Sequence, residues 1–202
     1  MVKNLKKEIS LALAELGAIK FGRFKLTSGK ESSYYIDLRL VPSHPKTFRR
    51  IVRVYVEEAK KIGLKRFDAV AGIPTSGMVY ASVLAYTLKK PFLYVRKEPK
   101  SWGEKRRIEG VLNRDARVLV VDDLITTGKS LVEAVDCVRE EGGMVTDALV
   151  LIDREEGGEK SLRDKGVRLH SFLRIREVLG FLVKAGKINI SQYEEAIRQV
   201  KT

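Results

Sequence analysis

The feature that most constrains the fold of this chain is the stretch from Val118 to Ser130, which reads VLVVDDLITTGKS. Val118–Val121 are four consecutive valine or leucine residues, the pattern of a short strand that is buried on both faces of a parallel sheet. After the turn Thr126–Ser130, apolar residues recur at helical spacing, so we predict a helix over 129–141. The stretch therefore predicts a strand, a tight turn and a helix, the repeating unit of an α/β fold.

Two carboxylates, Asp122 and Asp123, stand where this strand ends. In open α/β sheets, ligands bind at the carboxyl ends of the strands, where backbone N–H groups and the dipole of the next helix favour a phosphate. Carboxylates beside such a site would repel phosphate unless they hold sugar hydroxyl groups, a metal ion or a developing positive charge. A phosphorylated ribose offers all three roles, so the turn predicts a phosphosugar site.

The same turn has two simpler interpretations. It suits a plain helix N-cap, in which acidic residues favour the helix dipole by about 1 kcal/mol. Gly128-Lys129-Ser130 also matches the end of the phosphate loop of nucleoside triphosphatases. That motif needs a glycine five positions before Gly128, and Asp123 stands there, so the spacing excludes it.

Strand and helix patterns alternate along the rest of the chain. After an N-terminal amphipathic helix, short strands at 24–27 and 34–38 flank a Ser-Gly-Lys turn and form a small hood. Further strands are predicted at 67–72, 92–96, 118–121 and 147–152, and helices at 44–62, 78–88, 129–141, 175–184 and 191–201. This alternation predicts a mostly parallel central sheet that is flanked by helices.

Length and composition favour one domain. The chain has 202 residues, of which 44% are hydrophobic, and no linker-like stretch divides it. We expect a single domain over 1–202, with the N-terminal helix and hood in about 1–40 and the ligand-binding core in about 65–155. The N-terminus carries neither a signal-peptide pattern nor a long apolar run, so we expect a soluble, cytoplasmic protein without membrane contact.

The net charge indicates which kinds of ligand the protein would attract, and the cysteine content bears on disulfide bonding. The net charge of +13 would attract nucleic acid or a small phosphorylated substrate alike. The single cysteine, Cys137, falls on the apolar face of a predicted helix, so we expect it to be buried, and no disulfide framework exists.

A second turn and a long loop accompany the acidic turn. Gly72–Gly77 also joins a strand to a helix, and its glycines allow the backbone to approach an anion. Residues 96–110 lack periodicity and carry Pro and Gly, which predicts a long loop. Its basic residues suit a lid that neutralises a leaving group and excludes water. Trp102 among these residues also suits base stacking on nucleic acid, but one aromatic residue gives this interpretation little support.

Together these motifs resemble a known family. The acidic pair followed by Thr-x-Gly is similar to the signature of type I phosphoribosyltransferases, which bind phosphoribosyl diphosphate (PRPP). Three further motifs narrow the resemblance to the orotate phosphoribosyltransferases. These are the hood segments FxLxSG at 24–29 and SYYID at 33–37, the loop motif RKExK at 96–100, and the late turn DREEGG at 153–158. The similarity runs from about 21 to 158 and implies the type I phosphoribosyltransferase fold, an α/β class with an N-terminal hood.

The resemblance assigns site residues position by position. It implies catalytic roles for Lys100, Asp122 and Asp123. It implies PRPP binding by Lys25, Thr75, Ser76, Arg96, Lys97, Lys100, Trp102, Asp122, Asp123, Leu124, Ile125, Thr126, Thr127, Gly128, Lys129 and Ser130. It implies orotate binding by Tyr34, Tyr35, Thr126 and Arg154, and an arginine fork suits a carboxylate.

The resemblance also implies the reaction, the cofactor and the assembly. The 5-phosphoribosyl group of PRPP would be transferred to N1 of orotate, which gives orotidine 5′-monophosphate and pyrophosphate in pyrimidine biosynthesis. Mg²⁺ would bind mainly through the substrate, with Asp122 or Asp123 as candidate protein ligands. The family forms homodimers in which the loop reaches the neighbouring subunit's site.

Two positions depart from the pattern of many family members, and two other functions compete. Trp102 stands where many members have His, so we expect no general acid there, and Thr75-Ser76 replaces a Tyr-Lys pair. A PRPP-sensing transcription regulator would need an added DNA-binding helix-turn-helix, yet only one helix precedes residue 21, so nucleic acid is disfavoured. A purine phosphoribosyltransferase would not need the anion-directed set of Tyr34, Tyr35 and Arg154.

Overall fold

The computed structural model describes residues 2–25, 31–96 and 107–200. Its helices are α1 (Val2–Glu15), the 3₁₀ helix η1 (Leu38–Ser43), α2 (Pro45–Ile62), α3 (Ser76–Leu88), α4 (Lys129–Glu140), α5 (Gly158–Arg163), α6 (Ile175–Lys184) and α7 (Ile190–Ile197). Its strands are β1 (Ile19–Lys25), β2 (Glu31–Ile36), β3 (Ala69–Gly72), β4 (Phe92–Val95), β5 (Ile108–Glu109), β6 (Arg117–Val121), β7 (Leu124–Ile125), β8 (Met144–Asp153) and β9 (Arg168–Arg174).

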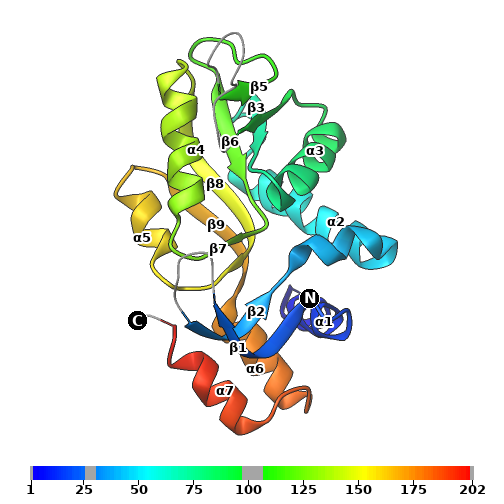
Figure 1. The fold of residues 1–202 in the computed structure, drawn as a ribbon. Coiled ribbons are helices and arrows are strands. Elements are labelled where there is room, and N and C mark those ends of the chain that lie inside the picture. Colours follow the sequence, from blue (N-terminus) through cyan, green and yellow to red (C-terminus); the bar gives the residue numbers. More distant parts are fainter. Residues whose placement is uncertain (1, 26–30, 97–106, 201–202) are drawn as a thin grey trace.

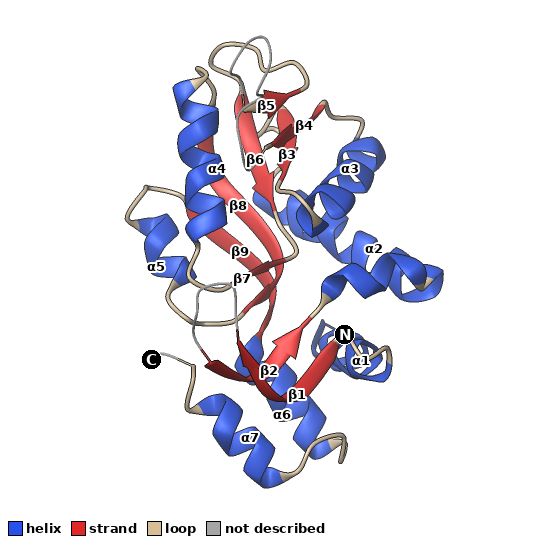
Figure 2. Ribbon diagram, in the orientation of Figure 1, coloured by secondary structure: helices blue, strands red, loops and turns tan. Residues whose placement is uncertain are grey.

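The main sheet is mostly parallel, as predicted. Its strands lie in the order β5-β4-β3-β6-β8-β7, with β9 paired to β8, and among the described strands of this sheet β5 alone runs antiparallel to its neighbour. Helices cover both faces, with α4 and α5 on one side and α2 and α3 on the other (Figure 1 and Figure 2). The predicted hood also forms, because β1 and β2 pair antiparallel, apart from the main sheet, but its strands begin earlier than the predicted 24–27 and 34–38.

Alternate residues of the central strands face two separate hydrophobic clusters. In β6, Leu119 and Val121 belong to the cluster that includes α2, α3 and α6, whereas Val118 and Val120 belong to the cluster that includes α4. Each of these four residues is at most 2% exposed. This explains the unbroken apolar run, because a strand that is covered on both faces has no polar side.

Several elements differ from the predicted ones. The strand β9 was not predicted, although it pairs with β8 from Asp147 to Asp153, because its sequence RLHSFLR carries polar residues that weaken a buried-strand pattern. β5, β7, η1 and α5 are also absent from the prediction, since segments of 2 to 6 residues give too little periodicity to read, and β5 lies inside the predicted loop 96–110. Among the described residues, no helix is both long and apolar enough to span a membrane.

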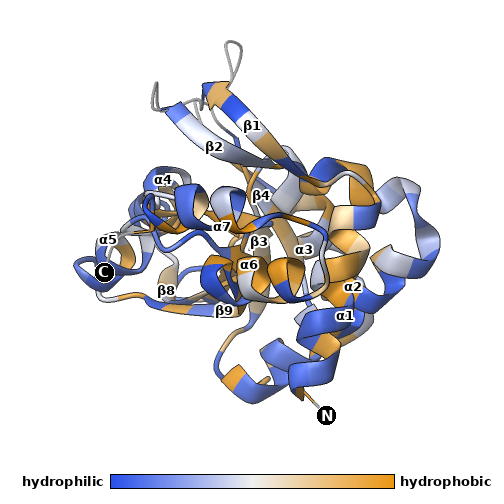
Figure 3. Cartoon of the chain, turned by 90° about the horizontal axis from the view of Figure 1, so that it is seen from below, coloured by the Kyte–Doolittle hydropathy of each residue, from blue (hydrophilic) through white to orange (hydrophobic). Residues whose placement is uncertain are grey.

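The hood projects from the body of the molecule, and the C-terminal helices pack beneath it (Figure 3). Tyr34 of β2 is fully buried, and it belongs to the same cluster as Ile188 and Val200 from the C-terminal part of the chain. The hood is therefore anchored from below by residues far away in the sequence.

Candidate functional site

The two predicted ligand turns follow adjacent strands. β3 and β6 are neighbours in the sheet, and the chain leaves β3 for β4 on one side but leaves β6 for β8 on the other. The carboxyl ends of the two strands therefore lie at a switch in strand order, which is where α/β sheets bind ligands. The structure therefore brings Gly72–Gly77 and Asp122–Ser130 to one place.

Gly77 shows how closely the turns pack. A Cβ atom on Gly77 would lie 2.8 Å from Cα of Asp122 and 3.0 Å from the carbonyl oxygen of Val121. Contacts below 3.0 Å are too short for real side chains, so only glycine fits here. The start of α3 is thus pressed against the acidic pair, and the two turns form one surface.

The acidic pair is fixed by its own backbone. Oδ1 of Asp122 accepts a hydrogen bond from the Asp123 N–H at 2.8 Å, and Oδ1 of Asp123 accepts one from the Leu124 N–H at 2.8 Å. The Asp123 carbonyl oxygen accepts from the N–H of Leu151 at 3.0 Å. Each carboxylate is therefore held in one direction at the strand end, as substrate binding by side chains requires.

Burial sets the electrostatics of this pair. Asp123 is half-buried, and desolvation raises the pKa of its carboxyl, while the nearby side chains of Asp122 and Ser76 lower that pKa only in part. The Ser76 Oγ is buried and completes no hydrogen bond of accepted geometry among the described residues. An unsatisfied buried hydroxyl is unusual, and it lies in the turn that the sequence assigns to pyrophosphate.

A tyrosine that the sequence analysis missed supports the acidic turn through a hydrogen bond to its backbone. The Tyr55 hydroxyl of α2 donates to the Asp122 carbonyl oxygen at 2.8 Å, and its ring stacks on Tyr80 at 5.3 Å between centroids. Burial raises the pKa of Tyr55 well above its ordinary value, so this hydroxyl stays a proton donor. The Tyr80 hydroxyl donates to the Leu38 carbonyl oxygen at 2.9 Å, which links the turn to the segment after the hood.

The rest of the acidic turn folds over α5. Gly128 adopts φ +85°, and a Cβ atom there would lie 3.1 Å from the Gly158 carbonyl oxygen. Leu124, Thr126 and Thr127 are half-buried and Ile125 and Gly128 are buried, whereas Lys129 and Ser130, at the start of α4, are exposed. The predicted phosphate turn therefore presents its polar end to solvent at a helix N-terminus, where an anion is favoured.

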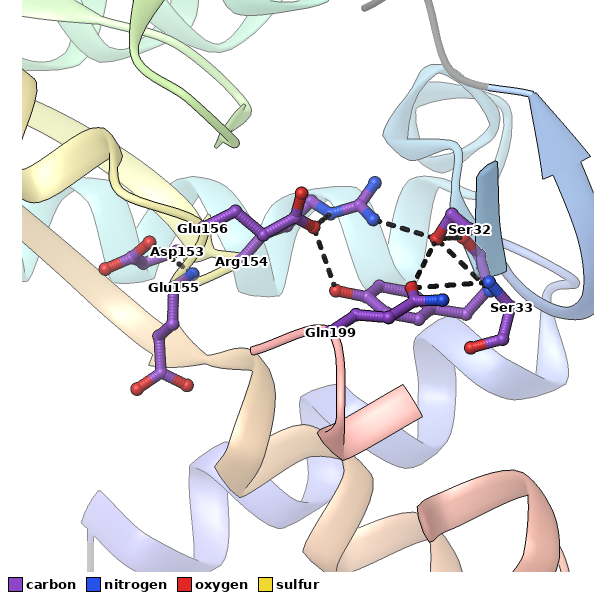
Figure 4. A network of polar contacts seen from close by, with 8 residues as sticks. Ser32, Ser33, Asp153, Arg154, Glu155, Glu156 and Gln199 are labelled. Atoms are coloured by element: carbon purple, nitrogen blue, oxygen red, sulfur yellow. Dashed lines mark hydrogen bonds and ion pairs between the residues drawn. The ribbon is translucent and has the colours of Figure 1, made fainter. Parts of the chain in front are cut away.

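Arg154 lies beside this turn and is almost completely buried. Its backbone N–H donates to the Ile125 carbonyl oxygen at 3.0 Å, which places it next to Thr126. The side chain is held by Glu156 (Nε to Oε1, 2.8 Å) and by Ser32 of the hood (Nη2 to Oγ, 3.2 Å), as Figure 4 shows. Its guanidinium also lies 4.4 Å from the centre of the Tyr34 ring. Arg154 is 3% exposed, so these contacts fix its orientation.

The predicted tyrosine pair does not form one surface. Tyr34 is fully buried under Arg154, and burial raises its pKa to about 12, whereas Tyr35 packs on Phe24 at 5.6 Å between ring centroids. Neighbouring residues of a strand point to opposite faces, and this alternation separates the two rings. The Tyr35 hydroxyl instead accepts from Nη2 of Arg39 at 3.1 Å.

The structure describes only some of the basic residues of the predicted site. Lys25 ends β1 and is exposed. Arg96 follows β4 and pairs with Glu109 of β5 (Nη1 to Oε1, 3.2 Å) at the same edge of the sheet as the turns. Lys97, Lys100 and Trp102 lie outside the described residues. Thr75 is exposed at the start of α3.

Several residues near the site were missed by the sequence analysis. Glu156 stands inside the quoted DREEGG turn, and Ser32 shares the Tyr34 face of β2 by the two-residue period, so both were open to prediction. Arg39 is held by Asp37 (Nε to Oδ1, 2.6 Å), and this hydrogen bond lowers the pKa of the Asp37 carboxyl. Gln199, which reaches Ser32, has no local sequence signal at all.

Known proteins resemble this chain over most of its length. Residues 43–171 match the family model of the phosphoribosyl transferase domain. The chain is 45% identical over 180 residues to the orotate phosphoribosyltransferase of Cenarchaeum symbiosum (strain A), and the match covers 89% of this chain and 90% of that protein.

Solved structures agree with the sequence relatives. The crystal structure of orotate phosphoribosyltransferase from Aeropyrum pernix matches with a TM-score of 0.76 and 35% identity, over 88% of this chain and 99% of that one. The UMP synthase of Leishmania donovani matches with a TM-score of 0.84 and 30% identity, over 98% of this chain but only 42% of that longer chain. With its two adjacent turns and these relatives, the chain belongs to the orotate phosphoribosyltransferase family.

Proposed function

We propose that this protein carries out the family's reaction with the two turns after β3 and β6 as its PRPP site and Arg154 as its orotate anchor. The 5-phosphoribosyl group of PRPP passes to N1 of orotate, and orotidine 5′-monophosphate and pyrophosphate leave. The observation that carries this assignment is the contact between Gly77 and Asp122, because it joins the pyrophosphate turn to the ribose turn.

In this proposal the two turns hold the two ends of PRPP. The amides of Thr126–Ser130 and the N-terminus of α4 bind the 5-phosphate, and Thr75 and Ser76 bind the pyrophosphate. The buried Ser76 hydroxyl supports this division, since it lies near the Asp123 carboxyl but completes no hydrogen bond of accepted geometry among the described residues, and a phosphate oxygen would give it a well-aligned acceptor.

The carboxylates of Asp122 and Asp123 act on the ribose between these ends. They hold its hydroxyl groups and stabilise the positive charge that develops on the ring as the bond to pyrophosphate breaks. Arg96, Lys97 and Lys100 stabilise the negative charge that accumulates on the departing pyrophosphate, and Lys25 and Trp102 complete the PRPP contacts. Covalent catalysis by the protein is not part of the proposal.

Orotate lies against Arg154 and Thr126. Tyr34 acts through its contact with Arg154, because the two hood tyrosines Tyr34 and Tyr35 point to opposite faces of β2 and cannot cover the base together. A guanidinium group presents parallel N–H donors that match a carboxylate, so Arg154 suits the acid group of orotate. The position of Arg154 next to the acidic turn supports this role, since N1 of the base must reach the anomeric carbon of the ribose.

Magnesium fits this site as an ion held mainly by the substrate. No group of three or more His, Cys, Asp or Glu side chains among the described residues offers a full set of ligands. Mg²⁺ commonly binds one or two protein carboxylates and completes its shell with phosphate oxygens and water, so Asp122 or Asp123 together with PRPP suffices. When bound, the ion neutralises charge on the pyrophosphate.

The assembly and location follow from the family in the same proposal. We expect a cytoplasmic homodimer in which the loop over 96–110 of one subunit completes the site of the other. Nucleic acid and membranes are not partners in this proposal.

An assay with PRPP, Mg²⁺ and one base at a time tests the function. Orotate should be consumed, as followed by its ultraviolet absorbance, whereas adenine, guanine and hypoxanthine should not. Lys100→Ala should lower kcat by about two orders of magnitude or more, because a charge that stabilises the leaving group acts in the transition state, and should change the KM for orotate much less. Consumption of a purine instead of orotate, or an unchanged kcat in the variant, would overturn the respective assignment.

A further inference from the structure

The C-terminal segment after α7 reaches the hood at the point where the hood holds Arg154 (Figure 4). Oε1 of Gln199 accepts a hydrogen bond from the Ser32 Oγ at 3.0 Å and one from the Ser33 N–H at 3.3 Å. Ser32 and Gln199 are 167 residues apart in the sequence, so only the tertiary fold joins them. Nothing in the reaction described above requires a residue from this end of the chain.

The donors and acceptors fix the orientation of the Gln199 amide. The Ser33 N–H can only donate, so the Gln199 atom that faces it is the carbonyl oxygen. The Ser32 hydroxyl accepts from Nη2 of Arg154 at 3.2 Å, and its single proton points to the carbonyl oxygen of Tyr34 (2.7 Å) or of Gln199 (3.0 Å). The Tyr34 carbonyl oxygen alone can orient this proton, and Gln199 adds a second hold on Ser32, because it binds both the hydroxyl and the backbone N–H of the next residue, Ser33.

The guanidinium itself depends on this support. One side of Arg154 is bound to Glu156, and that carboxylate also accepts from the Tyr34 hydroxyl at 3.4 Å. Ser32 supplies the contact to Nη2 from the hood side. Ser32 and Arg154 are each 3% exposed, so water cannot replace a lost contact without rearrangement.

The C-terminal segment is itself firmly placed. Asn189 and Gln192 form a capping box at the start of α7, with the Asn189 side chain accepting from the Gln192 N–H at 2.8 Å. Ala196 is fully buried and Val200 is 8% exposed, so residues on both sides of Gln199 are anchored in the core. Gln199 therefore meets the hood from a fixed position.

We propose that Gln199 is a positioning residue for orotate binding, which acts by fixing Ser32 and thereby the orientation of the Arg154 guanidinium. The C-terminal segment then helps to set the affinity for the base, while it leaves the PRPP turns untouched. The proposal rests on the role of Arg154 in orotate binding proposed above.

Steady-state kinetics of four variants test this proposal. Gln199→Met keeps the volume of the side chain and removes the acceptor, and Ser32→Ala removes the hydroxyl. The double variant Ser32→Ala/Gln199→Met tests whether the two residues act in series. Glu195→Ala, an exposed change on α7, is the matched control.

We expect Gln199→Met to raise the KM for orotate about tenfold, the factor that one hydrogen bond is worth. The KM for PRPP, the midpoint of thermal unfolding and the control variant should change little. The double variant should raise the KM for orotate no more than Ser32→Ala alone, because residues that act through one another are not additive.

Three results would overturn the inference. They are an unchanged KM for orotate in Gln199→Met, an equal rise in the KM of both substrates, and multiplied effects in the double variant. Arg154→Lys separates this failure from a failure of the proposed function. If Arg154→Lys raises the KM for orotate and Gln199→Met does not, only the role of Gln199 is wrong. If neither variant changes this KM, Arg154 is not the orotate anchor.

Discussion

At the scale of single residues, the chemistry of this protein depends on charged side chains that are buried or half-buried. Arg154, at 3% exposed, lies against Glu156, and Asp123 has its pKa raised by burial. A buried charge costs free energy unless it is paired. Buried charged residues are therefore expected where they bind a ligand, or where they hold another residue that binds a ligand. Glu156 thus stabilises Arg154 in the absence of a substrate.

One prediction concerns the stability that this pair provides. Arg154→Met leaves the carboxylate of Glu156 in a buried position without its partner, which should lower the free energy of unfolding by about 3 kcal/mol. Urea denaturation measures this change. Arg154→Met/Glu156→Gln should recover part of the loss, whereas Arg163→Met, at an exposed position, should cost less than about 0.5 kcal/mol. Equal losses in the single and double variants would show that the ion pair is not the cause.

At the scale of elements, the site depends on how closely two strand–turn–helix units approach each other. One unit consists of β3 and α3, and the other of β6 and α4. Their strands are neighbours in the sheet, but the chain then continues in opposite directions across the sheet, from β3 to β4 and from β6 to β8. The carboxyl ends of both strands therefore lie side by side at the switch in strand order, and the backbones of the two turns approach closely at Gly77 and Asp122.

A glycine pair tests this approach. Gly77→Ala puts a methyl group 2.8 Å from Cα of Asp122, so α3 must move away from the acidic turn, and kcat/KM for PRPP should fall at least about tenfold. Gly180→Ala in α6 is the control, since nothing lies within 4 Å of its Cβ position, and it should stabilise the protein by about 0.5–1 kcal/mol. Unchanged kinetics in Gly77→Ala would mean that the turns do not work as one surface.

A second element-scale prediction concerns acid stability at the other end of the sheet. Asp147 of β8 is 4% exposed and binds His170 of β9 (2.7 Å) and Arg66 from the segment before β3 (3.0 Å). Burial alone would raise the pKa of Asp147, but hydrogen bonds from His170, Thr146 and Arg66 outweigh burial and lower it.

Because the pKa of Asp147 is lower in the folded than in the unfolded chain, its stabilisation is present above about pH 4 and is lost as the pH falls through the folded value. Asp147→Asn should therefore lower stability at pH 7 and flatten the dependence of stability on pH below 4. Denaturation curves between pH 2.5 and 7 measure this, with Asp164→Asn, at an exposed position, as the control. Parallel curves for wild type and Asp147→Asn would rule out this linkage.

At the scale of the whole molecule, the proposed site takes groups from every part of the chain. The hood supplies Ser32, the sheet supplies the two turns, and the C-terminal segment supplies Gln199. The single-domain organisation stays a prediction, and so does the homodimer with a shared loop.

Mixing two inactive variants tests the shared loop. If Lys100 serves the neighbouring subunit, a heterodimer of Lys100→Ala and Asp123→Asn contains one site with both native residues. Random pairing should then restore about a quarter of the wild-type activity after the subunits are dissociated and reassembled together. No recovery, in mixtures shown to contain heterodimers, would place both residues in the same subunit's site.

The sequence by itself determined the elements with strong local patterns and the residues with strong local motifs. The α2 boundary at Pro45–Ile62, the α6 boundary at Ile175–Lys184 and the turn after β6 were all readable, because apolar periodicity and turn chemistry act over a few residues. The tertiary structure decided what local patterns do not contain: the strand β9, the burial of Tyr34 under Arg154, and the contact of Gln199 with Ser32. These depend on hydrogen bonds and packing between segments far apart in the chain, and such pairings leave no trace in the order of neighbouring residues.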